Sequence, residues 1–224
     1  VEPVPCRTFE ESFAAVPAGL ADAAMIPIDN STAGRVADVH RLLPESGLHI
    51  IGEHFLPIQF QLMGLPGQSV TEARRVLSHV HALGQCRDVI RKHGLEPVVA
   101  HDTAGAAKIV AADGSAEQVA LAPSLAAEMY GLEIFEADVS DSSDNNTRFV
   151  LLAPEPYKVT GSEEKVITSL VFKTRSVPAA LYKALTGFAT NGVNITKLES
   201  YITDARHTVA QFYTDIDGAQ DDTN

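Results

Sequence analysis

The chain has 224 residues, of which 45% are hydrophobic and 21% are charged, as in an ordinary folded protein with an apolar core. Lys and Arg number 17 against 29 Asp and Glu, which gives a net charge of −12. Nucleic acids and anionic membrane surfaces bind clustered positive charge, so we expect no nucleic acid and no membrane as a partner.

The cysteines and the longest apolar runs limit further which class of protein the chain belongs to. Cys6 and Cys86 have neither CxxC nor Cys/His zinc spacing, so we expect no disulfide framework and no metal. Two isolated thiols fit a reducing compartment, here the cytoplasm. No apolar run reaches the roughly 18 residues of a membrane-spanning helix.

Helix and strand patterns alternate over residues 1–153. The Thr8–Glu11 segment is a capping box that predicts a helix over 9–16. Further helices are expected after Asn30–Gly34 as far as Pro44, and over 79–93, 102–112 and 123–130. Strands are expected over 23–28, within 49–65, and over 76–78, 97–100, 119–122, 133–139 and 149–153. This alternation predicts an α/β fold with a mostly parallel sheet.

The composition changes at residues 154–164, which are rich in Pro, Gly, Ser and charged residues and predict a linker. A strand over 166–173, a helix over 178–190 and strands over 194–203 and 208–216 follow. This βαββ order is most of a ferredoxin-like βαββαβ unit that is incomplete at the C-terminus.

Three strand ends carry small polar residues directly before an expected helix. They are Asn30–Ser31–Thr32, Ser78–His79 and Asp102–Thr103. Helix N-termini bind carboxylates and phosphates through unpaired N–H groups, and such turns converge at one edge of a parallel sheet. Each turn alone is better explained as a simple N-cap, whereas the three together make an anion-binding cleft an equal alternative.

The segment Asn145–Phe149 places a hydroxyl and a guanidinium immediately before an apolar strand. Arg148 has the geometry to hold a carboxylate with two hydrogen bonds, and Thr147 is able to donate one to a hydroxyl. The alternative is a surface turn with an ordinary arginine.

Several segments together resemble prephenate dehydratase. They are Pro27–Ile28–Asp29–Asn30–Ser31, Ser78–His79, Gln85–Cys86, Thr103–Ala104, Tyr130–Gly131–Leu132 and Asn146–Thr147–Arg148–Phe149. Residues 166–216 resemble the ACT regulatory domain that follows the catalytic part in this family. Several positions depart from the usual motifs: Asp29 replaces a Glu, Val80–His81 replace Pro-Gln, Ala179 replaces a Gly, and Tyr201–Ile202 replace Arg-Pro.

The resemblance implies a catalytic domain over residues 1–153 that lacks its N-terminal strand, a linker over 154–164 and an ACT domain over 165–224. The catalytic domain is expected to have two α/β lobes, like the periplasmic binding proteins. The family converts prephenate to phenylpyruvate, CO2 and water in phenylalanine biosynthesis and needs no cofactor.

The resemblance also implies the site residues. Thr147 is expected to assist the leaving hydroxyl by donating a hydrogen bond, and Arg148 and Asn30 complete the catalytic group. The expected substrate-binding residues are Ser31, Ser78, Gln85, Thr103 and Phe149. L-Phenylalanine is expected to inhibit at Ala180, Leu181, Asn194, Leu198, Glu199 and Ser200, between paired ACT domains of a homodimer or homotetramer.

Two other functions stay open at this point. Arogenate dehydratase differs only in a substrate amine in place of a ketone, and the sequence does not separate the two. A non-catalytic, two-lobed sensor of amino acids or anions needs Arg148 but has no special use for Thr147.

Overall fold

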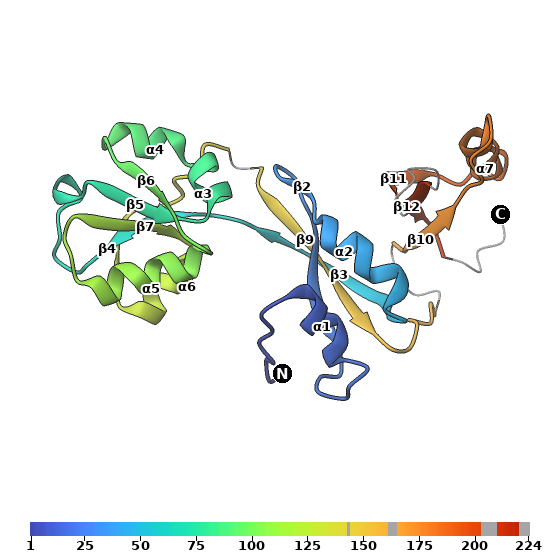
Figure 1. Ribbon diagram of the computed structural model, residues 1–224, viewed down its shortest axis with the longest axis horizontal. Helices are drawn as coiled ribbons and strands as arrows, with labels where there is room; N and C mark the ends of the chain where they lie inside the picture. The colour runs from blue at the N-terminus through green and yellow to red at the C-terminus, as the bar shows by residue number, and fades with distance from the viewer. Residues whose placement is uncertain (143, 161–164, 203–209, 220–224) are drawn as a thin grey trace. The chain divides into compact units, whose positions relative to one another are not determined.

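The computed structural model describes residues 1–142, 144–160, 165–202 and 210–219 (Figure 1). These residues form two compact units. One comprises Val1–Ile26, Val36–Glu53 and Val150–Asn224, and the other comprises Pro27–Arg35 and His54–Phe149. We call them the terminal unit and the central unit, and each is described by itself.

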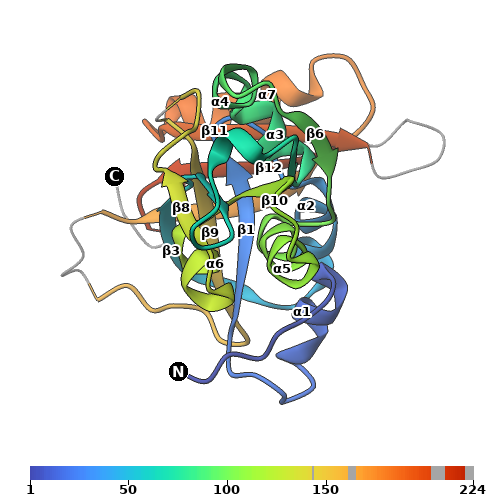
Figure 2. The same ribbon diagram turned by 90° about the vertical axis from the view of Figure 1, so that its left-hand side faces the viewer.

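The central unit contains a five-stranded sheet in the order β6-β5-β7-β4-β8. Its strands are β4 (Gln61–Gly64), β5 (Arg75–Ser78), β6 (Glu96–Val99), β7 (Gln118–Ala122) and β8 (Glu133–Glu136). Helices α3 (Val80–Gln85) and α4 (Arg87–Lys92) lie on one face, and α5 (Thr103–Asp113) and α6 (Ser124–Tyr130) lie on the other (Figure 1, Figure 2). A short 3-10 helix spans Val70–Glu72.

Alternating side chains of these strands build a separate apolar core on each face of the sheet. Val76 and Leu121 pack with α3 and α4, whereas Leu77 and Ala120 pack with α5 and α6. Successive strand residues point to opposite faces, so runs that are apolar throughout fill both cores. This explains why the buried strands of the sequence show no polar alternation.

The central sheet is mostly parallel, as expected, except that β4 runs opposite to the other four strands. Strand β5 is parallel to β6 and β7, but β4 is antiparallel to both β7 and β8. Helical crossovers connect β5, β6 and β7 and impose the parallel direction. The chain reaches β4 directly from β3 (His49–Pro57), without such a crossover, so its direction is not constrained in this way.

The single helix expected over 79–93 is two helices that meet at Cys86, whose φ and ψ are −128° and 36°. The Asp141 carboxylate accepts hydrogen bonds from the N–H groups of Arg87 and Asp88 at 2.9 and 3.0 Å. The N–H of Asp141 donates to the Gln85 carbonyl at 2.7 Å. A loop distant in sequence therefore supplies the caps of a new helix start, which no local pattern reveals.

A second sheet has four strands in the order β2-β1-β9-β3. The strands β1 (Ala24–Asn30), β3 and β9 (Asn146–Ala153) cross the boundary between the units, and β2 (Gly34–Arg35) forms a hairpin with β1. The terminal unit adds α1 (Phe9–Ala15), α2 (Ala37–Leu42) and a 3-10 helix over Leu43–Glu45. As the capping box predicts, the Thr8 hydroxyl accepts from the Glu11 N–H at 3.2 Å.

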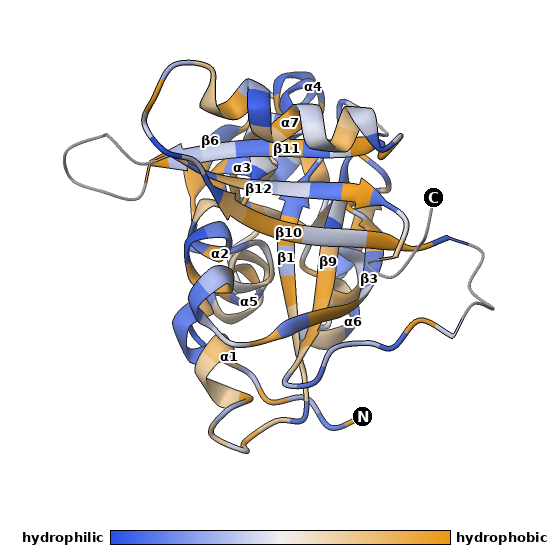
Figure 3. Cartoon of the chain, turned by 90° about the vertical axis from the view of Figure 1, so that its right-hand side faces the viewer, coloured by the Kyte–Doolittle hydropathy of each residue, from blue (hydrophilic) through white to orange (hydrophobic). Residues whose placement is uncertain are grey.

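The predicted βαββ pattern is confirmed over the described residues. Strands β10 (Ile167–Lys173), β12 (Ala210–Asp217) and β11 (Ile195–Ile202) form an antiparallel sheet in this order (Figure 3), with α7 (Ala180–Thr190) following β10. Phe172 packs between Phe188 of α7 and Phe212 of β12, at ring-centroid distances of 6.4 and 5.1 Å. Residues 161–164 of the expected linker and 203 and 208–209 of the expected strands lie outside the described residues.

Candidate functional site

The Asn30–Thr32 segment is not the helix N-terminus that we expected at Ser31. It is the turn of the β1–β2 hairpin, and α2 begins only at Ala37. The Asn30 side-chain oxygen accepts from the N–H groups of Thr32 and Ala33 at 3.0 and 2.8 Å. An asparagine that bonds to its own following backbone forms an Asx turn, which competes with helix initiation.

Ser31 links this turn to the chain just before β9. Its hydroxyl donates to the Asp144 carbonyl and accepts from the Asn146 N–H at 2.9 Å. The backbone N–H of Ser31 donates in turn to the Asn146 carbonyl at 2.9 Å. The Ser31 hydroxyl therefore acts as both donor and acceptor in holding two loops together.

A ring of four neutral side chains lies beside this link. Asn30 Nδ2 donates to Asn145 Oδ1 at 2.7 Å, and Asn145 Nδ2 donates to Gln85 Oε1 at 2.8 Å. Gln85 Nε2 donates to the Thr32 hydroxyl at 2.5 Å, and that hydroxyl donates to Asn30 Oδ1 at 2.8 Å. We call these four residues the amide ring. It is closed, and every member both donates and accepts.

Thr147 is attached to the amide ring through Asn30, whose second N–H donates to the Thr147 Oγ1 at 3.0 Å. The Thr147 oxygen is thus an acceptor in this pair, and its own proton points elsewhere. A hydroxyl that accepts a hydrogen bond becomes a better donor, because the two bonds polarise each other. Thr147 is arranged to donate to a further group.

Arg148 lies on the opposite face of β9 from Thr147, because adjacent residues of a strand alternate. Its Nη1 lies 3.9 Å from Asp29 Oδ2, and the two side chains are only 12% and 22% exposed. The guanidinium therefore faces a carboxylate of the protein itself. Phe149, half-buried, follows on the Thr147 side.

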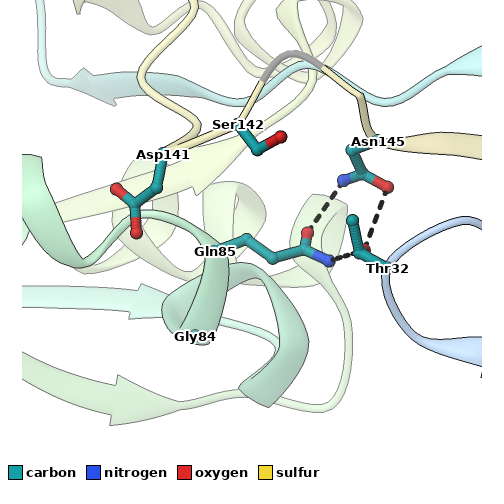
Figure 4. A pocket seen from close by; sticks show the side chains of 6 residues that line it. All are labelled: Thr32, Gly84, Gln85, Asp141, Ser142 and Asn145. Atoms are coloured by element: carbon teal, nitrogen blue, oxygen red, sulfur yellow. Dashed lines mark hydrogen bonds between the residues drawn. The ribbon is translucent and has the colours of Figure 1, made fainter.

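A hollow of about 190 Å³ opens next to the amide ring (Figure 4). Its lining residues are Thr32, Gly84, Gln85, Asp141, Ser142 and Asn145. Three members of the ring thus form part of its wall, and Asn145 is the most buried of them, with 3% exposure. The wall offers amide and hydroxyl groups together with the Asp141 carboxylate, which caps α4.

The other two expected anion sites are strand–helix junctions but differ from a free helix N-terminus. The Ser78 hydroxyl is buried and donates to the Leu121 carbonyl at 2.6 Å. Thr103 begins α5, but the Asp102 side chain already accepts from the Gly105 N–H at 2.5 Å. Burial lowers the pKa of His79, and the nearby His81 and His101 lower it further.

Cys86 fills the apolar core beside Gln85. Its side chain is fully buried, and burial, followed by the charge of Asp141, raises the pKa of the thiol to about 12. The thiol is therefore protonated and unreactive at neutral pH. Across the described ranges, no three His, Cys, Asp or Glu side chains are grouped to hold a metal ion.

The residues expected to bind phenylalanine belong to α7, β11 and the segment between them. Ala180 and Leu181 open α7, and Asn194 donates to Asp217 Oδ2 at 2.6 Å. On β11, the exposed Leu198 and Ser200 alternate with the half-buried Glu199.

No helix of the described residues is long and apolar enough to cross a membrane.

Sequence reasoning missed Thr32 and Asn145 as members of the site. Both lie inside segments that the sequence singled out, Asn30–Ser31–Thr32 and Asn145–Asn146–Thr147. The sequence feature that could have identified them is a polar side chain within a segment that already contained expected site residues. Their closure into one ring joins positions 53 to 115 residues apart and is visible only in the folded chain.

Comparison with known proteins now adds to this geometry. The family model described as prephenate dehydratase matches residues 1–157. The bifunctional N-acyl-homoserine lactone acylase/prephenate dehydratase of Komagataeibacter europaeus is 46% identical over 96% of this chain and 76% of its own length. Arogenate dehydratase/prephenate dehydratase 2 of Arabidopsis thaliana is 42% identical over 89% of this chain, which spans about half (52%) of that relative.

Solved structures agree with the sequence relatives. The prephenate dehydratase of Arthrobacter aurescens, solved in complex with L-Phe, has a TM-score of 0.86 at 31% identity and covers 98% of this chain and 73% of its own. The α/β fold is therefore that of the two-lobed prephenate dehydratases. A family model that covers most of the chain and relatives above 40% identity lead to one assignment: this chain belongs to the prephenate dehydratase family.

Proposed function

We propose that the intact protein is a prephenate dehydratase that converts prephenate to phenylpyruvate, CO2 and water at the amide ring. The observation that carries the proposal is the direction of the Asn30–Thr147 hydrogen bond, which leaves the Thr147 proton for a ligand. Loss of CO2 and hydroxide makes the six-membered ring of prephenate aromatic, so the driving force of the reaction lies in the substrate. The site has to hold the substrate and stabilise the departing hydroxide.

Each role follows from the chemistry of the group. Thr147 donates a hydrogen bond to the developing hydroxide, and Asn30 strengthens that donor. Gln85 orients the substrate from the wall of the hollow. Arg148 holds a substrate carboxylate, which has to reach a guanidinium that lies beside Asp29. Ser31 and Ser78 contribute by holding the loops and strands on which these groups stand.

The experiment that tests this function is a turnover assay of the full-length protein. Prephenate is supplied first and arogenate second, and phenylpyruvate and phenylalanine are followed separately. Formation of phenylpyruvate supports the proposal, and formation of phenylalanine alone assigns the protein to arogenate. Arogenate is the second candidate because the Arabidopsis relative carries both names.

A third candidate activity comes from the Komagataeibacter relative, whose name includes N-acyl-homoserine lactone acylase. Amide hydrolysis commonly uses an activated nucleophile. Two nucleophilic side chains of the central unit are committed elsewhere: the buried Ser78 hydroxyl donates to a carbonyl, and the Cys86 thiol stays protonated. The Ser142 hydroxyl, in contrast, lines the hollow. Adding an acyl-homoserine lactone to the same assay decides whether this activity is present.

For regulation, we propose a division into a catalytic domain (residues 1–153), a linker (154–164) and an ACT domain (165–224). The order of β10, α7, β11 and β12 supports the last of these. We propose that L-phenylalanine binds there, near Ala180, Leu181, Asn194 and the 198–200 stretch, because the Arthrobacter structure contains this amino acid. Strand β11 lies at the edge of its sheet, which suits pairing with a second copy in a homodimer or homotetramer.

Calorimetric titration tests the regulatory part. Heat of binding and a raised melting temperature at millimolar phenylalanine are expected for the intact protein. The absence of both would leave the C-terminal part without this ligand, whatever the outcome of the turnover assay.

The two free thiols fit the reducing cytoplasm that we propose as the location.

A further inference from the structure

Thr32 stands in the wall of the hollow at the point where the amide ring closes. Its hydroxyl accepts from Gln85 Nε2 at 2.5 Å and donates to Asn30 Oδ1 at 2.8 Å. Thr32 itself is an exposed residue of the β1–β2 turn and belongs to no helix or strand. Its side chain is therefore not required to fill a core.

The two ends of the Gln85 amide are held by different partners. Asn145 Nδ2 donates to its oxygen at 2.8 Å, and Thr32 receives one of its two N–H groups (Figure 4). A glutamine side chain has several rotatable bonds and loses about 1.5–2 kcal/mol of rotamer entropy when fixed. Two anchors fix both the position of the amide and the direction of its second N–H.

The other members of the ring keep their orientation without the Thr32 hydroxyl. The backbone N–H groups of Thr32 and Ala33 hold the Asn30 oxygen at 3.0 and 2.8 Å. Asn30 then directs both Asn145 and Thr147 through its two N–H groups. Loss of the hydroxyl therefore removes one of the two anchors of Gln85. It also removes a long contact of 3.5 Å with Asn145 Oδ1, which Asn30 still holds at 2.7 Å.

We propose that Thr32 is a positioning residue that acts through Gln85 and presents the second N–H of this amide to the substrate in the hollow. The inference rests on the proposed dehydratase function of the same site. It assigns a task to a turn residue that touches the reaction only through its neighbour.

The test compares two substitutions in the full-length protein. Thr32→Val keeps the shape and removes the hydroxyl, whereas Thr32→Ser keeps the hydroxyl and removes a methyl group. We expect Val to lower kcat/KM about tenfold, which corresponds to about 1.4 kcal/mol, and Ser to recover most of that loss. Because the residue is exposed, melting temperatures of both variants should match the wild type.

A double-mutant cycle with Gln85→Ala separates positioning from a general structural effect. If Thr32 acts through Gln85, Thr32→Val causes no further loss in the Gln85→Ala background. An equal loss in both backgrounds, or equal activities of the Val and Ser variants, would overturn the inference.

The two proposals fail in distinguishable ways. A wild-type protein that turns over neither prephenate nor arogenate overturns the proposed function, and this inference with it. A fully active wild type together with a fully active Thr32→Val variant overturns this inference alone.

Discussion

Two polar networks, one in each unit, link strands and loops that are distant in sequence, but they differ in what surrounds them. The amide ring of the central unit joins Asn30, Thr32, Gln85 and Asn145 beside a hollow. The C-terminal sheet of the terminal unit carries the other. There the Tyr213 hydroxyl donates to Ser169 at 3.0 Å, and Ser169 donates to the Asp215 carboxylate at 2.5 Å.

The ring of His40, whose centroid lies 4.9 Å from that of Tyr213, connects these contacts to Tyr201. The Tyr201 hydroxyl accepts from Gln211 Nε2 at 2.6 Å and donates to the carbonyl of His40 on α2 at 2.9 Å. Tyr213 and Asp215 are only 1% and 2% exposed. We call these contacts the buried network.

Similar hydrogen bonds have different effects in the amide ring and in the buried network. A buried network gains stability when its partners are satisfied, and losing one leaves a desolvated group behind. A partly exposed ring contributes less to stability, but it holds donors in place for a ligand. Substitutions in the amide ring should therefore reduce activity, whereas substitutions in the buried network should reduce stability.

The largest expected effect is that of Thr147→Ala, which removes the hydrogen-bond donor that we propose for the leaving group. We expect kcat to fall about a hundredfold, as for loss of a transition-state hydrogen-bond donor, with little change in KM. Thr147→Ser, which keeps the hydroxyl, should recover most of the rate. Steady-state kinetics check this, and an unchanged kcat for the Ala variant would exclude Thr147 from the reaction.

Next is Arg148→Lys, which keeps the charge but loses the planar guanidinium. We expect KM for the substrate to rise more than about tenfold, because an ammonium cannot form two parallel bonds to a carboxylate. Arg75→Lys, at an exposed position of β5, is the control and should bind normally. Equal KM values for the two variants would leave Arg148 with a structural role beside Asp29.

Tyr201→Phe breaks the buried network. We expect the free energy of unfolding to fall by about 1–2 kcal/mol, because Gln211 and the His40 carbonyl each lose a partner. Turnover at saturating substrate should stay close to wild type. Tyr182→Phe, at a largely exposed tyrosine of α7, is the matched control for urea denaturation. Equal stabilities would show that the Tyr201 hydroxyl is not required.

Ala179→Gly should raise stability by about 1 kcal/mol. Ala179 precedes α7 with φ at +62°, a left-handed conformation that disfavours side chains other than glycine. Ala180→Gly provides the contrast, because a glycine inside α7 should destabilise the helix. Thermal unfolding checks both directions, and a lower melting temperature for Ala179→Gly would contradict the strain.

The smallest effect concerns a partly exposed cluster of charged side chains. Lys92 and His93 bond to Glu136, and the Lys92 hydrogen bond is the largest cause that lowers the pKa of this carboxyl from 4.5. A depressed pKa stabilises the fold above the unfolded value, and this contribution disappears as the pH falls through the folded value. Glu136→Gln should cost under about 1 kcal/mol at pH 7 and less at pH 3.

Denaturation curves at both pH values measure this loss. Glu128→Gln, at an exposed position of α6, serves as the control. A cost for Glu136→Gln that is equal at pH 7 and pH 3 would contradict the pKa argument.

The elements that rest on local chemistry were predictable. The Thr8 cap predicts α1, the Asp102 cap and Gly114 delimit α5, and the composition of 154–164 separates the C-terminal βαββ pattern. Two expected elements were wrong. The Asx turn of Asn30, together with the bond between Ser31 and Asn146, replaces the helix start at Ser31, and the bonds of Asp141 divide the expected helix at Cys86.

The sequence by itself determined the alternation of elements, the apolar runs that fill both faces of the central sheet, and the Thr147–Arg148–Phe149 segment. Only the tertiary structure decided that β9 begins at Asn146, which places Thr147 and Arg148 on opposite faces of this strand, and that Asn30, Thr32, Gln85 and Asn145 close into one ring. The physical reason is the range of the forces. Caps, turns and periodicity act within a few residues, whereas a closed ring of hydrogen bonds exists only after distant loops have packed together.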